Sequence, residues 1–388
     1  MILDSDQIAL RDAARRFSRE RLLPTYMQRE QEGVTDRALL REMGELGLLG
    51  VDVAPEHGGM GVNSVTTGLI VEELAYGDFN VSAVVLVMSL CGAIIARNAN
   101  PKVAAEWLPR IPRGDAILAL SITEPGCGSD AGALQLKARR GADVYILSGE
   151  KTSTTYCDSA DAFIVFARTG SIESGARGVT AFLVPSDTPG LQVTRFRDLG
   201  SHCSGRGSVF FDEVRVPADH RLGAQDKGFT QVMAGFDYSR ALIALQCLGA
   251  AQASLDEAWA YVKEREAFGG PIARFQGVSF PLVEGETLVA AARQLSYHAL
   301  ELRDAGQPHT VEAAQVKALA PKTAFDVIHQ CALTLGHYGW SMDLPHQQRM
   351  RDVMGLEIGD GTAGIMKMIV ARARAGRAAT EERGTAPA

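Results

Sequence analysis

A block of short apolar runs occupies the middle of this 388-residue chain, between two longer stretches with helical periodicity. The runs alternate with turns that contain Gly and Asp, which is the pattern of strands joined by hairpins. They cover residues 116–122, 137–140, 144–148, 162–167, 179–185, 191–195 and 208–216. We expect an all-β unit of about 100 residues, folded as a small barrel or sandwich. No G-x-G-x-x-G segment opens a βαβ unit, so a dinucleotide-binding fold is not predicted.

The first helical stretch predicts an all-α N-terminal domain. Asp4 and Gln7 have the spacing of a capping box at the start of a helix. Residues 81–96 are the most apolar part of the chain and carry no charge. That run is shorter than the roughly 20 residues that cross a bilayer, so we predict a buried helix and no membrane partner. The glycine-rich segment 54–62 lacks the Lys-Ser/Thr pair of a P-loop and is interpreted as a turn.

Helical periodicity returns after residue 222 and predicts a C-terminal four-helix bundle. The predicted helices cover residues 229–265, 278–305, 309–335 and 360–376. The expected fold class is therefore α+β multidomain, with helical, β and helical units in that order. We place the domains at residues 1–115, 116–225 and 226–376, followed by a disordered tail at residues 377–388.

Composition excludes several functional classes. A net charge of -7 and the absence of a basic stripe argue against a nucleic-acid partner. The six cysteines form no CxxC pair, which favours a reducing cytoplasm over a disulfide framework. The eight histidines show no ligand spacing, so no metal site is predicted. The N-terminus lacks the pattern of a signal peptide.

An apolar run that predicts a buried strand leads into the segment SITEPGCGSD, residues 121–130, where Pro125-Gly126 forces a tight turn. Gly126 and Gly128 carry no Cβ, so another molecule can approach the backbone closely. Thr123 and Ser129 add hydroxyls on either side of the turn. Two interpretations remain at this point: a loop that faces a cofactor or thioester, and a plain surface turn.

Taken with later segments, this one resembles the flavin-dependent acyl-CoA dehydrogenases over residues 4–375. The matching segments are TEPGCGSD at 123–130, SGEK at 148–151, VRVP at 214–217, REAFG at 265–269 with Gln276, and RD at 351–352 leading to GDGT at 359–362. Removal of a hydride from a thioester β-carbon needs an acceptor that side chains cannot supply. The resemblance implies that FAD is this acceptor.

The resemblance implies that Asp360 is the catalytic base that takes the α-proton. Most relatives carry Glu at this position, so the carboxylate here is one methylene shorter. Three readings stay open: a base that serves a bulkier or α-branched acyl group, a plain N-cap of the last helix, and related chemistry with the base at another position. Some relatives place the base at the position of Ser239, which cannot serve as one.

The resemblance also implies the residues that bind FAD. Ile122, Thr123 and Thr155 match positions that touch the isoalloxazine ring, and Ser129 matches a contact near the thioester. The family usually has Trp-Ile-Thr where this chain has Ser153-Thr154-Thr155, so an aromatic shield is missing. Towards the dinucleotide end, the implied residues are Arg265, Phe268, Gln276, Gly336 and Thr362, of which Arg265 reaches FAD from a neighbouring subunit.

For the substrate, the resemblance implies an acyl-CoA or acyl-carrier-protein thioester, contacted by Ser129 and Arg240. An ion pair between Arg240 and Asp237 is an equal alternative for that arginine. Cys91 interrupts the apolar run with a small group past which an acyl chain could lie, although ordinary core packing explains it as well. The implied partners are an electron-transfer flavoprotein or another acceptor, and further copies in a homotetramer or homodimer. A same-fold flavoenzyme with another reaction, or a non-catalytic acyl-CoA-binding protein, are the alternatives.

Overall fold

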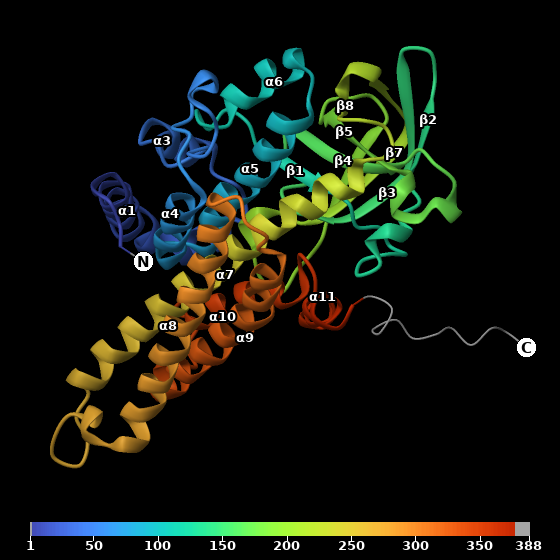
Figure 1. Ribbon diagram of the computed structural model, residues 1–388. Coiled ribbons are helices and arrows are strands. Elements are labelled where there is room, and N and C mark those ends of the chain that lie inside the picture. The colour runs from blue at the N-terminus through green and yellow to red at the C-terminus, as the bar shows by residue number, and fades with distance from the viewer. Residues whose placement is uncertain (1, 377–388) are drawn as a thin grey trace, which may run out of the picture.

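A computed structural model describes residues 2–376, and the predicted tail lies outside the described residues (Figure 1). Six helices precede the sheet: α1 (Ser5–Phe17), α2 (Tyr26–Glu32), α3 (Arg37–Glu45), α4 (Ser64–Gly77), α5 (Phe79–Asn98) and α6 (Pro101–Trp107). The predicted capping box is confirmed, because the Asp4 carboxylate accepts from the Gln7 N–H at 2.8 Å and the Gln7 side chain caps in return. The segment 54–62 contains only a three-residue 3-10 turn, as its interpretation as a turn requires.

Helix α5 has 20 residues, four more than the predicted run, and is long and apolar enough to cross a membrane by length and composition alone. In the structure, 78% of its most apolar window is buried within the protein. It packs between α4, α7 and the first strand of the sheet. Its apolar character is therefore that of a core helix.

The central unit is one eight-stranded sheet. Its strands are β1 (Leu118–Ser121), β2 (Lys137–Arg140), β3 (Val144–Thr154), β4 (Ala162–Arg168), β5 (Val179–Pro185), β6 (Leu191–Arg195), β7 (Gly207–Pro217) and β8 (Arg221–Leu222). The order is β6-β7-β3-β2-β4-β5-β8, and β1 pairs in parallel with β4 outside this path. Most of the pairs between longer strands, such as β3–β7 and β4–β5, are antiparallel.

Strand β4 is buried on both faces, which explains its continuous apolar sequence. Ile164 and Phe166 join the large core that is shared with the helices. Phe163 and Val165 point into a second core that the sheet encloses by itself. The sheet is thus fixed against α5 and α7 on one face, and this junction holds the candidate site.

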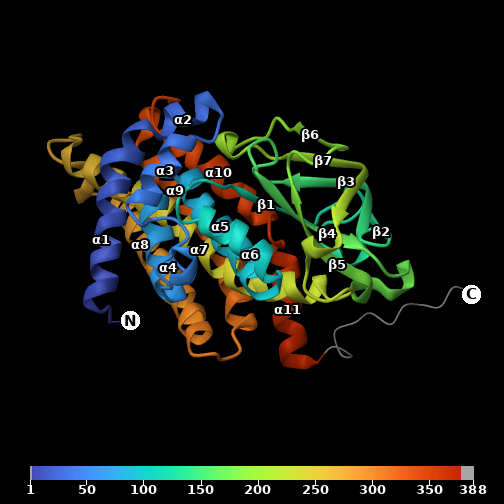
Figure 2. The same ribbon diagram turned by 90° about the horizontal axis from the view of Figure 1, so that it is seen from above.

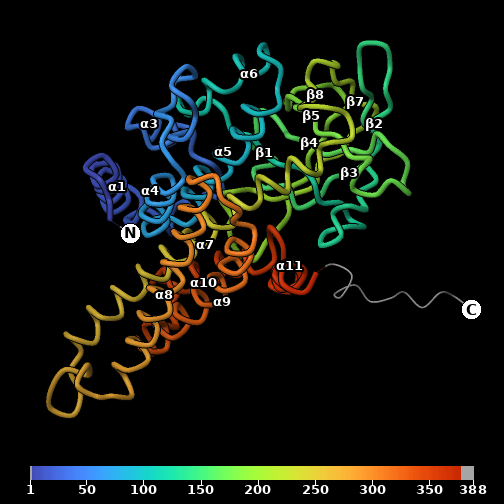
Figure 3. The backbone as a smooth tube through the Cα atoms, viewed as in Figure 1, coloured from blue at the N-terminus to red at the C-terminus, as the bar shows by residue number. Residues whose placement is uncertain are grey.

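The C-terminal helices are α7 (Gly228–Glu264), α8 (Gln276–Asp304), α9 (Thr310–Thr334), α10 (His346–Ile358) and α11 (Ala363–Ala375). Helix α7 runs unbroken from the sheet to the far end of the bundle, where the connection to α8 projects away from the rest of the molecule (Figure 3). Helices α8, α9 and α10 pack along it, and α9 also packs against both α8 and α10.

The C-terminal helical unit is confirmed, but the sequence prediction missed one of its helices. The bundle's fourth member is α10, which had not been predicted. The predicted helix at 360–376 begins only at Ala363, as α11, and packs on α9. Two views place α11 at the end of the bundle nearest the sheet (Figures 1 and 2).

Candidate active site

The loop that follows β1 turns sharply and opens outward. Glu124 and Cys127 exchange backbone hydrogen bonds of 3.0 and 3.1 Å around Pro125 and Gly126, so the predicted tight turn is confirmed. A Cβ on Gly126 or Gly128 would meet nothing within 4 Å. The outer side of this turn is therefore open to another molecule.

A buried ion pair holds the base of the same loop. The Lys151 ammonium on β3 donates to the Glu124 carboxylate and to the Ile122 carbonyl, each at 2.8 Å. The Glu124 carboxylate also accepts from the backbone N–H groups of Gln135 and Leu136, at 2.6 and 2.8 Å. Burial lowers the Lys151 pKa to about 8, against the opposing pull of Glu124. The pair fixes both arms of the loop, from Ile122 to Leu136.

Three hydroxyls that are predicted to contact the flavin or the thioester lie on the loop after β1 and in the turn after β3. Thr123, Ser129 and Thr155 make no side-chain hydrogen bond within residues 2–376, and all three are at least partly exposed. The Thr123 carbonyl, by contrast, accepts from the Thr152 N–H at 2.8 Å and belongs to the scaffold. Next to Thr155, Tyr156 adopts a left-handed φ of 61°, a conformation that non-glycine residues rarely take and that often marks functional sites.

Asp360 lies in a turn between α10 and α11, with a left-handed φ of 54°. The N-cap of α11 is Thr362, whose hydroxyl accepts from the Ile365 N–H. The reading of Asp360 as the N-cap is therefore wrong, because the helix begins two residues later than that reading requires. The Asp360 N–H has no acceptor within residues 2–376, and its side chain is half-buried.

Two buried residues from other helices hold this turn. Ser239 on α7 donates its hydroxyl to Asp360 Oδ2 at 3.0 Å. The Lys317 ammonium on α9 donates to the carbonyls of Leu356 and Gly361, at 2.6 and 3.0 Å. Burial lowers the Lys317 pKa, while Asp360 opposes that shift.

Arg240 is buried next to this turn on α7. Its guanidinium donates to Asp237 at 2.9 Å, and Asp237 also accepts from the Thr310 hydroxyl at 2.6 Å. The ion pair that was the alternative reading of Arg240 is confirmed. Its Nε is buried and has no hydrogen-bond partner within the described part of the chain.

The other predicted FAD residues lie at the opposite end of the bundle. Arg265 directly follows the last residue of α7, and Arg265, Phe268 and Gln276 are exposed. Gly336 belongs to the same end, since Tyr338 stacks its ring edge-on against Tyr261 near the end of α7. At about 1.5 Å of rise per residue, Arg240 and Arg265 are separated by about 37 Å along one straight helix. Arg265 is therefore far from the Asp360 turn of the same copy, which lies beside Ser239 and Arg240.

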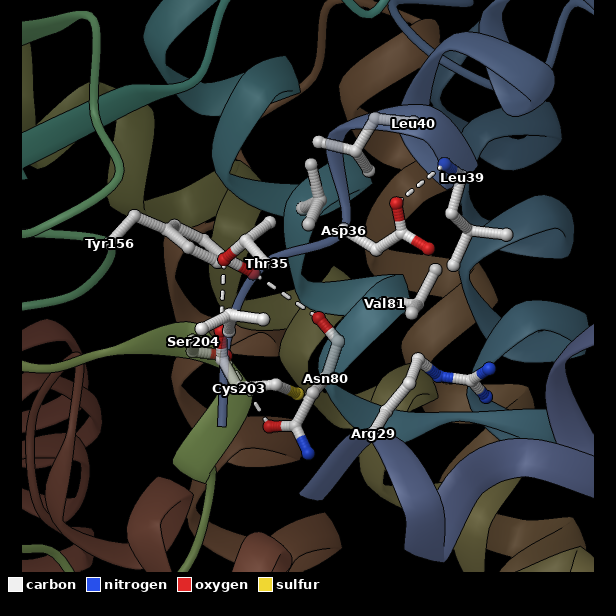
Figure 4. Close-up of a pocket in the computed structure, with 12 residues that line it drawn as sticks. Arg29, Thr35, Asp36, Leu39, Leu40, Asn80, Val81, Tyr156, Cys203 and Ser204 are labelled. Carbon is white, nitrogen blue, oxygen red and sulfur yellow. Dashed lines mark hydrogen bonds between the residues drawn. The ribbon is translucent and has the colours of Figure 1, made fainter. Parts of the chain in front are cut away.

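Cys91 is fully buried in α5 and has no surface open to a ligand in this structure. Burial also raises the pKa of its thiol far above the usual range. A nearby cavity of about 20 Å³, lined by Arg29, Tyr156 and Cys203 among others, has room for about one water (Figure 4). It contains neither Asp360 nor the loop after β1 and is too small for a cofactor.

Sequence reasoning did not identify Glu124, Lys151, Ser239 or Lys317 as partners of the site. Glu124 and Lys151 stood inside the matched segments, but nothing in the sequence paired them. Only Lys317 carried a local signal, because it is the one charged residue in the stretch 313–321 of a predicted helix.

The chain is similar over nearly its whole length to known proteins. The acyl-CoA dehydrogenase N-terminal, middle and C-terminal domains match residues 4–115, 119–214 and 226–374. The mitochondrial short-chain specific acyl-CoA dehydrogenase of Rattus norvegicus is 34% identical over 93% of this chain and 88% of its own. The structure of butyryl-CoA dehydrogenase from Megasphaera elsdenii has a TM-score of 0.93 at 33% identity, covering 97% and 99% of the two chains. A structure described as an electron transferring flavoprotein of Acidaminococcus fermentans also has a TM-score of 0.93, at 33% identity, covering 96% and 99%.

Proposed function

Because the chain belongs to the acyl-CoA dehydrogenase family, we propose that it catalyses the FAD-dependent α,β-dehydrogenation of an acyl thioester. The observation that carries this proposal is the Asp360 turn. A carboxylate with a free neighbouring N–H stands at the junction of bundle and sheet, anchored by buried groups from α7 and α9. The product is the α,β-unsaturated thioester.

The residues of the site fit the cofactor. The free hydroxyls of Thr123, Ser129 and Thr155 supply hydrogen-bonding groups, and the open Pro-Gly turn admits a planar ring system. When bound, FAD would supply the acceptor for the β-hydride. Arg265 and Gln276 of a neighbouring copy would hold its dinucleotide end, since those of the same copy lie too far away.

In the proposed reaction, Asp360 accepts the α-proton on its carboxylate. The Asp360 N–H would donate to the thioester carbonyl oxygen, where negative charge develops as the proton leaves. Arg240, next to this turn on α7, would contact the carrier.

We further propose a compact, branched or cyclic acyl group on CoA or an acyl carrier protein, since the base is one methylene short. An electron-transfer flavoprotein would reoxidise the enzyme in the cytoplasm. Self-association into a homotetramer or homodimer is supported by Phe268 and Trp340, which are 90% and 92% exposed on a single copy.

An anaerobic thioester panel tests the proposed function. The purified, flavin-loaded protein is mixed with saturated straight-chain and branched acyl-CoAs and acyl-carrier-protein thioesters, and the flavin absorbance band is followed. We expect bleaching with at least one of them, most rapidly with a branched short chain. Bound flavin that no thioester bleaches would favour a same-fold flavoenzyme of another reaction. A protein that remains colourless after FAD is added would favour a non-catalytic acyl-CoA-binding role.

Replacing Arg265 with alanine should weaken FAD binding about 10–100-fold, because a charge-assisted hydrogen bond to phosphate is lost. Arg265 is exposed and its guanidinium has no partner within residues 2–376, so the fold should be unchanged. Lys263→Ala, also an exposed basic residue at this end of α7, is the matched control. Titration of both variants with FAD measures the affinity, and the oligomeric state is measured in parallel. Equal FAD affinity of the two variants would contradict a role of Arg265 in FAD binding.

A further inference from the structure

We infer that Ser239 is a positioning residue, which presents one oxygen of the Asp360 carboxylate to the substrate by binding the other. This inference rests on the proposed function, in which Asp360 is the base. It assigns a role to a position that in some relatives carries the base itself and here carries a hydroxyl.

The geometry separates the two carboxylate oxygens. Asp360 Oδ2 accepts the Ser239 hydroxyl at 3.0 Å, a shorter contact than the 3.3 Å from that hydroxyl to the Phe236 carbonyl in its own helix. Asp360 Oδ1 has no hydrogen bond within residues 2–376. Oδ1 is thus the oxygen with a free lone pair, and we assign the proton transfer to it.

Hydrogen bonds from Lys317 hold the backbone of the turn, so only the orientation of the Asp360 side chain still has to be fixed. Lys317 ties Gly361 to the end of α10, and Asp360 itself has a left-handed conformation between two glycines. Ser239 is 0% exposed on α7, a helix that packs against α9 and the sheet. A hydroxyl held in this way can stop rotation of the carboxylate, which a flexible surface residue could not do.

The proton balance is simple. The Cα–H bond of the thioester breaks and an O–H bond forms on Asp360 Oδ1. The released electron pair forms the Cα–Cβ double bond as the β-hydride departs to the flavin of the proposed function. Ser239 keeps its own proton and donates a hydrogen bond throughout, so it acts only through Asp360.

The other charged groups near the Asp360 carboxylate are the same in the wild-type protein and in the Ser239 variants. Lys317 on α9 faces Asp360, and Arg240 on α7 and Glu357 on α10 lie close enough to Lys317 to influence it. Asp237 neutralises Arg240. On α11 the nearest charged residue in sequence is Lys367, which is exposed. None of these is altered when the Ser239 hydroxyl is removed, so a change in pH profile would report that hydroxyl.

The test compares Ser239→Ala, Ser239→Thr and Ser239→Val in the flavin-loaded enzyme. We expect Ala and Val to lower kcat about 10–100-fold, the loss expected for a hydrogen bond to a charged group, with KM changed less than about twofold. A hydrogen bond donated to a carboxylate favours its ionised form, so the acid limb of the kcat/KM profile should move to higher pH in the Ala and Val variants and not in Thr. Thr should retain activity, although it has the same shape as Val. Ser296→Ala, which removes another buried hydroxyl bonded within its own helix, is the matched control.

The results can distinguish failure of the Ser239 role from failure of the proposed function. Equal activity and pH profiles for Thr and Val would overturn the role of Ser239 while leaving Asp360 as the base, provided that Asp360→Asn is inactive. An active Asp360→Asn enzyme would instead overturn the base assignment. The Thr–Val pair keeps the test decisive even where Ser239→Ala fails to fold, since both introduce the same extra methyl group.

Discussion

Replacing Asp360 with asparagine is expected to lower the rate of flavin bleaching by acyl thioesters about 10²–10⁴-fold. Asparagine has the shape of aspartate and tolerates the left-handed φ of 54° at this position, so the turn should persist. It can still accept the Ser239 hydroxyl through its amide oxygen, but it cannot take a proton. The measurement is rapid-mixing absorbance under anaerobic conditions.

Flavin content is the internal control for that result. FAD should remain bound to Asp360→Asn and to Asp360→Ala, because the predicted flavin hydroxyls lie on the loop after β1 and in the turn after β3. Exposed Asp343→Ala provides a matched loss of a carboxylate away from the site. Turnover retained by Asp360→Asn would contradict the base assignment and direct attention to a base at another position.

Replacing Lys151 with methionine is expected to cost about 3–5 kcal/mol of unfolding free energy, the usual effect of leaving one member of a buried ion pair alone. Glu124 would keep its two backbone donors but lose its cation, and the Ile122 carbonyl would lose its partner. We also expect reduced flavin content, since both arms of the loop depend on this pair. Denaturant unfolding followed by circular dichroism, with flavin absorbance, measures both effects.

A second pair serves as the control. Lys322→Met breaks an exposed ion pair with Asp326 on α9 and should change stability by less than about 0.5 kcal/mol. The double variant Lys151→Met/Glu124→Gln should be less destabilised than Lys151→Met alone, because no buried charge is then left without a partner. Equal stability of Lys151→Met and Lys322→Met would show that the Glu124 pair does not hold the loop.

Helix α10 shows why one element escaped prediction. Its buried face carries Arg349 and Asp352 instead of a periodic apolar stripe. Arg349 pairs with Glu257 on α7 at 2.8 Å, and Asp352 accepts from the Tyr26 hydroxyl at 2.6 Å and from the Ser201 N–H at 2.6 Å. These partners come from three distant parts of the chain, so the local pattern resembles a surface segment.

The sequence alone determined the order of helical, β and helical units, because apolar periodicity and turn residues are local properties of a chain. It also determined the family, through ordered short segments, and the position of the Asp360 carboxylate between two glycines. Only the tertiary structure decided that Ser239 binds this carboxylate, that Lys151 and Glu124 meet under the loop, and that Arg265 lies at the far end of α7 from Ser239. Such contacts join residues dozens to hundreds of positions apart, and their geometry exists only once the helices and the sheet have packed.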